Sequence, residues 1–228
     1  MLEDINQEVY NPVDRIYKFI ESGLIAIPEG GLNIIDIGFG NIAGYFVLEQ
    51  KRLLNSFIGI NQIPEEELEV VRLDPERSSS WKKGFGIPTE HIRGNIYEKY
   101  LEFNRGCDSD FQSLNKDDFE RKYKFIFDKT LEQIVEDEVI ESKCDLLILS
   151  NILHFVDFKI TIDILKIGKE LLGSEGKIYI QVLTEEYTFS EKSNKFSTQM
   201  LNDLESLLII ESKTSLILGQ IEYLGRIK

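Results

Sequence analysis

The chain has 228 residues, of which 42% are hydrophobic and 29% are charged, and its formal net charge is −14. This length and composition are typical of one globular α/β domain. The sequence has no run of the roughly 20 apolar residues that cross a bilayer, and its acidic start does not have the apolar core of a secretory signal. The negative charge disfavours a nucleic-acid partner, because phosphates would be repelled.

The two cysteines, Cys107 and Cys144, match neither a disulfide framework nor the spacing of a zinc site. Cys144 precedes an apolar run and is predicted to be a buried free thiol. The sequence shows no cluster of metal ligands, so we predict no metal site. It also contains no phosphate-binding loop with the pattern Gly-x-x-x-x-Gly-Lys. The cysteine pattern favours a reducing, cytoplasmic location.

The first part of the chain alternates between helical and strand patterns. Apolar residues at helical spacing predict helices, and short apolar runs before glycine or asparagine predict strands. The expected elements are a helix over 12–23, a strand over 32–37, a helix over 42–55, a strand over 56–60, a helix over 64–73 and a third strand over 91–93. A loop is expected over 78–88.

Residues 97–143 are long for a connection between two strands, and they are acidic. We predict that they form an inserted segment within a single domain that spans residues 1–228, and that this segment is a candidate lid. Its second half, 119–141, has a largely helical pattern, but residues 123–128 are also compatible with a short strand.

The last part of the chain returns to a clear alternation. We expect a strand over 145–150, a helix over 158–172, a strand over 177–183, a helix over 196–207 and two more polar strands over 208–218 and 220–228. Strands that alternate with helices predict a doubly wound, mostly parallel, Rossmann-like α/β sheet. Helices should cover both faces, and the C-terminal strands should add an antiparallel edge strand.

The most informative feature is the segment 32–41, LNIIDIGFGN. An apolar strand ends there in an acid, Asp36, and Gly38 and Gly40 follow. Glycines at such a turn let the backbone approach a ligand closely. The alternative is a tight turn between strand and helix that binds no ligand.

The strand ends, taken in order, resemble those of class I S-adenosylmethionine-dependent methyltransferases, and the resemblance covers residues 12–228. The segment DIGFG at 36–40 resembles the first motif of that family. The other matching segments are 57–66 at the second strand, 93–96 at the third, 144–155 at the fourth, 171–180 at the fifth and 196–204 in a late helix. The resemblance implies S-adenosyl-L-methionine as the cofactor.

The same resemblance implies roles for individual residues. Gly38, Phe39 and Gly40 would pass under the methionine half of the cofactor, and Asp36 would either hold that loop or reach the methionine ammonium through water. The remaining predicted cofactor residues lie at the other strand ends: Asn61 and Gln62 at the ribose, Asn95 and Ile96 at the adenine, and Ser150 and Asn151 near the transferred methyl group.

Both Asn61 and Asn95 stand where the family usually has an acid. An amide can accept a hydrogen bond, but it does not provide the charge-assisted grip of a carboxylate. Both residues are also compatible with plain turns, where asparagine is common. His154 is the candidate catalytic residue, because a histidine can act as a general base near neutral pH; the alternative is a histidine that packs beside Phe155.

We therefore predict a methyltransferase (a transferase) that acts on a small-molecule acceptor. Two alternatives remain: an inactive methyltransferase-like binding or scaffold protein, to which the two amides point, and a methyltransferase of a protein or tRNA. No membrane partner is expected, and the sequence is compatible with a homodimer or a protein partner.

Overall fold

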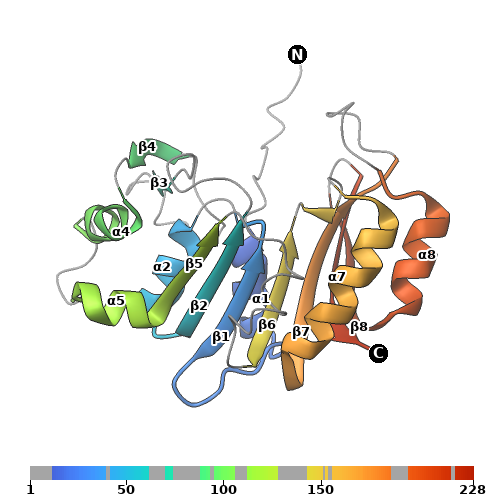
Figure 1. Ribbon diagram of the computed structural model, residues 1–228, viewed down its shortest axis with the longest axis horizontal. Coiled ribbons are helices and arrows are strands. Elements are labelled where there is room, and N and C mark those ends of the chain that lie inside the picture. The colour runs from blue at the N-terminus through green and yellow to red at the C-terminus, as the bar shows by residue number, and fades with distance from the viewer. Residues whose placement is uncertain are drawn as a thin grey trace.

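The described residues form one seven-stranded sheet and a separate two-stranded sheet (Figure 1). The computed structural model describes residues 12–39, 42–61, 70–73, 88–92, 95–105, 112–127, 143–150, 152–153, 156–185, 195–216 and 219–228. The helices are α1 (Pro12–Glu21), α2 (Ala43–Gln50), α4 (Ile96–Asn104), α5 (Lys116–Lys122), α7 (Phe158–Leu171) and α8 (Thr198–Ser206). The strands are β1 (Leu32–Ile37), β2 (Leu54–Asn61), β3 (Val70–Leu73), β4 (Pro88–Ile92), β5 (Tyr123–Phe127), β6 (Cys144–Ser150), β7 (Leu172–Leu183), β8 (Leu208–Leu216) and β9 (Gln220–Ile227).

The large sheet has the strand order β5-β2-β1-β6-β7-β9-β8. The pairs from β5 to β7 are all parallel, whereas β9 is antiparallel to both β7 and β8. The prediction of a mostly parallel sheet with an antiparallel C-terminal strand is confirmed; the reversed strand is β9, and β8 forms the edge. The carboxyl ends of β5, β2, β1 and β6 meet at the top of Figure 1.

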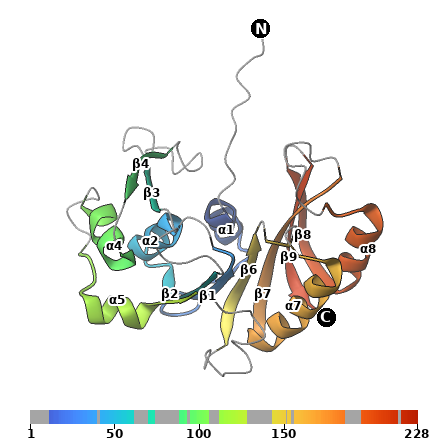
Figure 2. The same ribbon diagram turned by 45° about the horizontal axis from the view of Figure 1, so that its top comes forward.

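The sheet has a hydrophobic core on each face, as its central strands require. Successive side chains of a strand point to opposite faces, so Ile34 of β1 joins one core and Ile35 joins the other. Residues of α1, α2, α4 and α5 complete the first core, and residues of α7 and α8 complete the second. Figure 2 shows α1, α2 and α4 on one side of the sheet and α7 and α8 on the other. The apolar run 146–149 of β6 is fully buried, which is expected for a parallel strand covered on both faces.

The third strand of the large sheet is not the one that the sequence predicted. Residues 88–92 form β4, which pairs only with β3 in an antiparallel ladder from Val70↔Ile92 to Leu73↔Pro88. The position next to β2 is taken by β5, whose aromatic-rich sequence YKFIF favours a strand. The prediction of a helix over 64–73 is therefore wrong at 70–73, and the strand alternative for 123–128 is confirmed at 123–127.

The region from 97 to 143 contributes directly to the large sheet. It contains most of α4, all of α5 and the strand β5, and α5 leads straight into β5. β3 and β4 lie near α2 and α4 respectively, and they are seen at the upper left in Figure 1. Among the described residues, no helix combines the length and the apolar character needed to cross a bilayer.

Candidate active site at the carboxyl edge of the sheet

The turn after β1 lies where the strand order of the sheet reverses. The chain proceeds from β1 to β2 and β5 on one side, and then returns to β6 on the other. At this turn Gly38 has φ +75, a conformation that L side chains rarely adopt, and its N–H donates to the Ile60 carbonyl at 2.7 Å. A Cβ on Gly38 would lie 2.7 Å from Cδ1 of Ile152, which follows β6. This turn therefore needs glycine because of its backbone and because of its neighbour.

Phe39 fixes the turn from the inside. Its side chain is only 1% exposed, and its ring packs against Phe57, Phe125 and Phe127 with centroid distances of 5.6 to 6.1 Å. The ring lies directly over β2 at Gly59, where an added Cβ would come within 2.7 Å of it. Gly59 thus leaves the space that the Phe39 ring fills.

Asn61, the last residue of β2, is bonded to the same turn. Its Nδ2 donates to the Phe39 carbonyl oxygen at 2.6 Å. Because a carbonyl can only accept, the orientation of the Asn61 amide follows from this contact. The residue predicted at the ribose therefore lies beside the glycine turn, and its amide N–H holds that turn.

Asp36 is buried beneath the turn and faces α2. It is 4% exposed, and the Tyr45 hydroxyl donates to its Oδ2 at 2.5 Å. Burial in this apolar core raises the pKa of Asp36 to about 7, and the Tyr45 hydrogen bond opposes part of that rise. Burial also raises the pKa of Tyr45, and the neighbouring Asp36 adds to this. Asp36 is thus a carboxyl group that changes its charge near neutral pH.

A chain of polar side chains crosses the edge from β6 to β9. The Ser150 hydroxyl donates to Gln181 Oε1 at 2.8 Å, and Gln181 Nε2 donates to Gln220 Oε1 at 3.2 Å. Ser150 and Gln181 are 7% and 1% exposed. Because buried polar groups are costly unless they are hydrogen-bonded, this chain links the end of β6 firmly to β7 and β9.

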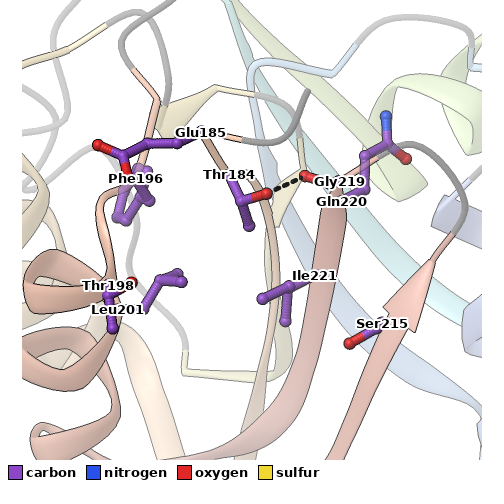
Figure 3. A pocket seen from close by; sticks show the side chains of 9 residues that line it. All are labelled: Thr184, Glu185, Phe196, Thr198, Leu201, Ser215, Gly219, Gln220 and Ile221. Carbon is purple, nitrogen blue, oxygen red and sulfur yellow. Dashed lines mark hydrogen bonds between the residues drawn. The ribbon is translucent and has the colours of Figure 1, made fainter. Parts of the chain in front are cut away.

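Gln220 also lines a cavity of about 290 Å³ at the carboxyl end of β7. Figure 3 shows the side chains of Leu201 and Ile221 on opposite sides of this space, and the Thr184 hydroxyl donates to the Gly219 carbonyl at 2.9 Å. The cavity has a mixed lining of apolar and polar side chains: Thr184, Glu185, Phe196, Thr198, Leu201, Ser215, Gly219, Gln220 and Ile221. Small-molecule sites commonly combine apolar walls with a few polar groups in this way.

Asn95 and Ile96 do not follow a strand of the seven-stranded sheet. Asn95 is the N-cap of α4, where its side chain accepts from the Glu98 N–H at 2.9 Å and forms a capping box. Ile96 is 5% exposed and belongs to the hydrophobic core. Their assignment to the adenine assumed that they follow the third strand, and this assumption is wrong, because that strand is β5. The other predicted residues, Gly40, Gln62, Asn151 and His154, lie outside the described residues, so their roles stay predictions.

Sequence reasoning missed the polar partners at this edge. Gln181 is one polar residue within the apolar strand segment IYIQVL, and that interruption is a usable signal for a buried hydrogen-bonding role. Tyr45, the partner of Asp36, gave no such signal because a tyrosine on an apolar helix face is common in cores.

Solved structures provide the comparison. Neither a family model nor a curated protein sequence matches the chain. The fold is similar to that of the N-methyltransferase NodS from Bradyrhizobium japonicum WM9, with a TM-score of 0.54, 11% identity and coverage of 95% of this chain and 97% of NodS. It is also similar to magnesium protoporphyrin IX methyltransferase (ChlM) from Synechocystis PCC 6803 with bound S-adenosylhomocysteine, with a TM-score of 0.54, 11% identity and coverage of 95% and 82%. The chain therefore has the fold of class I S-adenosylmethionine-dependent methyltransferases.

Proposed function

We propose that this protein is a methyltransferase that uses S-adenosylmethionine and acts on a small-molecule acceptor. The observation that carries the proposal is the position of the glycine turn. Gly38 follows the first strand at the point where the strand order reverses, and ligands of open α/β sheets bind at this point. NodS, which shares the fold, has been solved in complex with S-adenosylhomocysteine.

The residues present fit one end of this cofactor better than the other. The turn at Gly38 and Phe39 would hold the methionine end through its backbone, with Ser150 nearby at the end of β6. The ribose end differs, because Asn61 offers an amide that is bonded to Phe39 where a carboxylate is usual. When bound, the cofactor supplies a methyl group already activated on a sulfonium. The protein would contribute the orientation of the acceptor and the exclusion of water.

The cavity at the end of β7 supports a small acceptor. It lies on the same edge of the sheet as the glycine turn, and the hydrogen-bonded chain from Ser150 through Gln181 reaches its wall at Gln220. Its volume of about 290 Å³ is near the lower end of the range for small-molecule sites, roughly 300–1,000 Å³. A macromolecular acceptor such as tRNA is disfavoured by the net charge of −14.

The first test is the binding of S-adenosylhomocysteine by isothermal titration calorimetry. We expect saturable binding, and the absence of binding at millimolar concentrations would remove the proposal. Gly38→Ala should abolish binding, because the new Cβ would press on Ile152. The matched control is Gly23→Ala. Gly23 has a similar φ of +76 with no atom within 4 Å of an added Cβ, so this variant should keep its affinity while sharing the backbone strain.

A second candidate function is a methyltransferase-like protein that binds the cofactor without turnover. The engagement of Asn61 with Phe39 favours this alternative, because the usual grip on the ribose is changed. Transfer of a radiolabelled methyl group from S-adenosylmethionine, measured over a panel of small acceptors, separates the two functions. Binding without transfer to any acceptor, together with a stable protein partner, would favour the second.

A further inference from the structure

The strand β2 holds the glycine turn at three points. The side chain of Phe39 rests on β2 at Gly59, where only a glycine leaves room for the ring. The main chain of Phe39 is held by Asn61, whose Nδ2 donates to the Phe39 carbonyl at 2.6 Å. In addition, the Gly38 N–H donates to the Ile60 carbonyl at 2.7 Å. Three consecutive residues of β2 therefore contact two consecutive residues of the turn.

We propose, on the basis of the proposed function, that Asn61 is a positioning residue. It keeps the Gly38–Phe39 turn in the conformation that receives the cofactor, and it does not act as a ligand of the ribose. The amide at this position then has a physical reason. A carboxylate has no proton to donate at neutral pH, so an aspartate at 61 would set two acceptor oxygens against each other across the distance that the hydrogen bond now spans.

Replacement by aspartate distinguishes a positioning role of Asn61 from a ribose-binding role, because the two roles predict opposite changes in the affinity for S-adenosylhomocysteine. If Asn61 positions the turn, Asn61→Asp repels the Phe39 carbonyl and weakens the binding of S-adenosylhomocysteine by more than about tenfold. Asn61→Ala only deletes the hydrogen bond and should weaken binding by about fivefold. If Asn61 instead binds the ribose, the aspartate restores the charge-assisted grip and tightens binding. Tighter binding by Asn61→Asp, or unchanged binding by Asn61→Ala, would overturn the proposal.

A second ligand provides a further test. The affinity lost on mutation should differ between the two ligands if Asn61 contacts the ribose, and should be the same for both if Asn61 only positions the turn. The 3′-deoxy analogue of S-adenosylhomocysteine has lost one ribose hydroxyl. We expect Asn61→Asp and Asn61→Ala each to lower the affinity for both ligands by the same factor, because the turn is displaced for either. A loss confined to S-adenosylhomocysteine would show direct contact with the ribose and would contradict the positioning role.

The matched control lies at the other end of the same strand. Asn55 Nδ2 donates to Asn33 Oδ1 at 2.8 Å, so Asn55→Ala also removes one amide hydrogen bond from β2, but far along the strand from the turn. Its affinity for S-adenosylhomocysteine should equal that of the wild type. All titrations are made well below the melting temperature of each variant, so that only folded protein is compared. If the wild type binds neither ligand, the proposed function fails, and with it this role of Asn61; if the wild type binds and only the Asn61 variants depart from expectation, the proposed function stands.

Discussion

Asp36 and Glu222 are both buried carboxylates, yet the structure compensates them in different ways. Asp36, at 4% exposure, accepts a hydrogen bond from the neutral Tyr45 hydroxyl in the half of the sheet that contains the glycine turn. Glu222 of β9, at 1% exposure, is paired with the Arg15 guanidinium of α1 and also accepts from the Tyr179 hydroxyl at 3.1 Å. Glu222 lies beside a cationic partner, as a buried charge requires, whereas burial raises the pKa of Asp36.

The two carboxylates also differ in what surrounds them and in which elements they connect. Arg15 and Glu222 join the first helix to a C-terminal strand 207 residues away in sequence, and so tie the ends of the fold together. Around Asp36 the packing is mainly aromatic, with Tyr45 and Phe57 at a centroid distance of 4.2 Å. Asp36 is therefore held by a neutral hydrogen bond among packed rings, whereas Glu222 is held by a charge pair.

The largest expected effect comes from breaking the charge pair. Glu222→Ala leaves the Arg15 guanidinium, which is 15% exposed, without its carboxylate. Loss of one partner of a buried pair costs roughly 3–5 kcal/mol, and we expect the lower end, about 3 kcal/mol, because Arg15 can partly reach water. The measurement is the free energy of unfolding in urea. Glu120→Gln is the control, since it breaks the exposed pair between Lys116 and Glu120 and should change stability far less. If both variants lost the same free energy of unfolding, burial would not explain the stabilisation by the Arg15–Glu222 pair.

A smaller effect, with a definite sign, concerns pH. The pKa of Asp36 is about 7 in the folded protein and 3.8 as its ordinary value, so the folded state holds a proton that the unfolded state has released. The stability contributed by this proton is complete below the ordinary pKa and is lost as the pH rises toward 7. Asp36→Asn cannot ionise, and it keeps an oxygen that can accept from Tyr45. As the pH rises from about 5 to about 7, the free energy of unfolding of the variant should therefore increase by about 2 kcal/mol relative to that of the wild type.

Urea unfolding of both proteins across this pH range provides the measurement. A stability difference that does not change with pH would mean that Asp36 does not titrate there. Tyr45→Phe is a useful companion, because it removes the hydroxyl that lowers the pKa of Asp36. In that variant the pH-dependent loss of stability should extend to higher pH than in the wild type.

The sequence predicts the centre of this fold better than its sides. The central strands β1 and β6 consist mainly of apolar residues, as buried parallel strands do, and the sequence predicts both close to their observed bounds. The strand β5 was ambiguous, because YKFIF follows a charged helix and its strand identity depends on pairing with β2. Within the candidate site, the sequence predicts the turn at Gly38, because a glycine after a strand signals a backbone conformation that other residues rarely adopt. The partners of Asn61 and Glu222 lie 22 and 207 residues away in sequence, and no local pattern reports such contacts.

The smallest expected effect tests whether a polar group in the half with the glycine turn, Asn95, serves the cofactor or only the fold. Asn95 caps α4 by accepting from the Glu98 N–H at 2.9 Å, and a cap of this kind contributes about 1 kcal/mol. Asn95→Ala should therefore lower the free energy of unfolding by about 1 kcal/mol and leave the affinity for S-adenosylhomocysteine unchanged. Asn115→Ala is matched to it, because Asn115 caps α5 through the Asp118 N–H at the same 2.9 Å. If Asn95→Ala alone weakened binding tenfold or more, Asn95 would contact the cofactor in addition to its cap, and the assignment to adenine would regain support. If both variants lose the same stability and keep their affinity, Asn95 serves only as the cap of α4. The polar residues of the candidate site would then lie only at the strand ends.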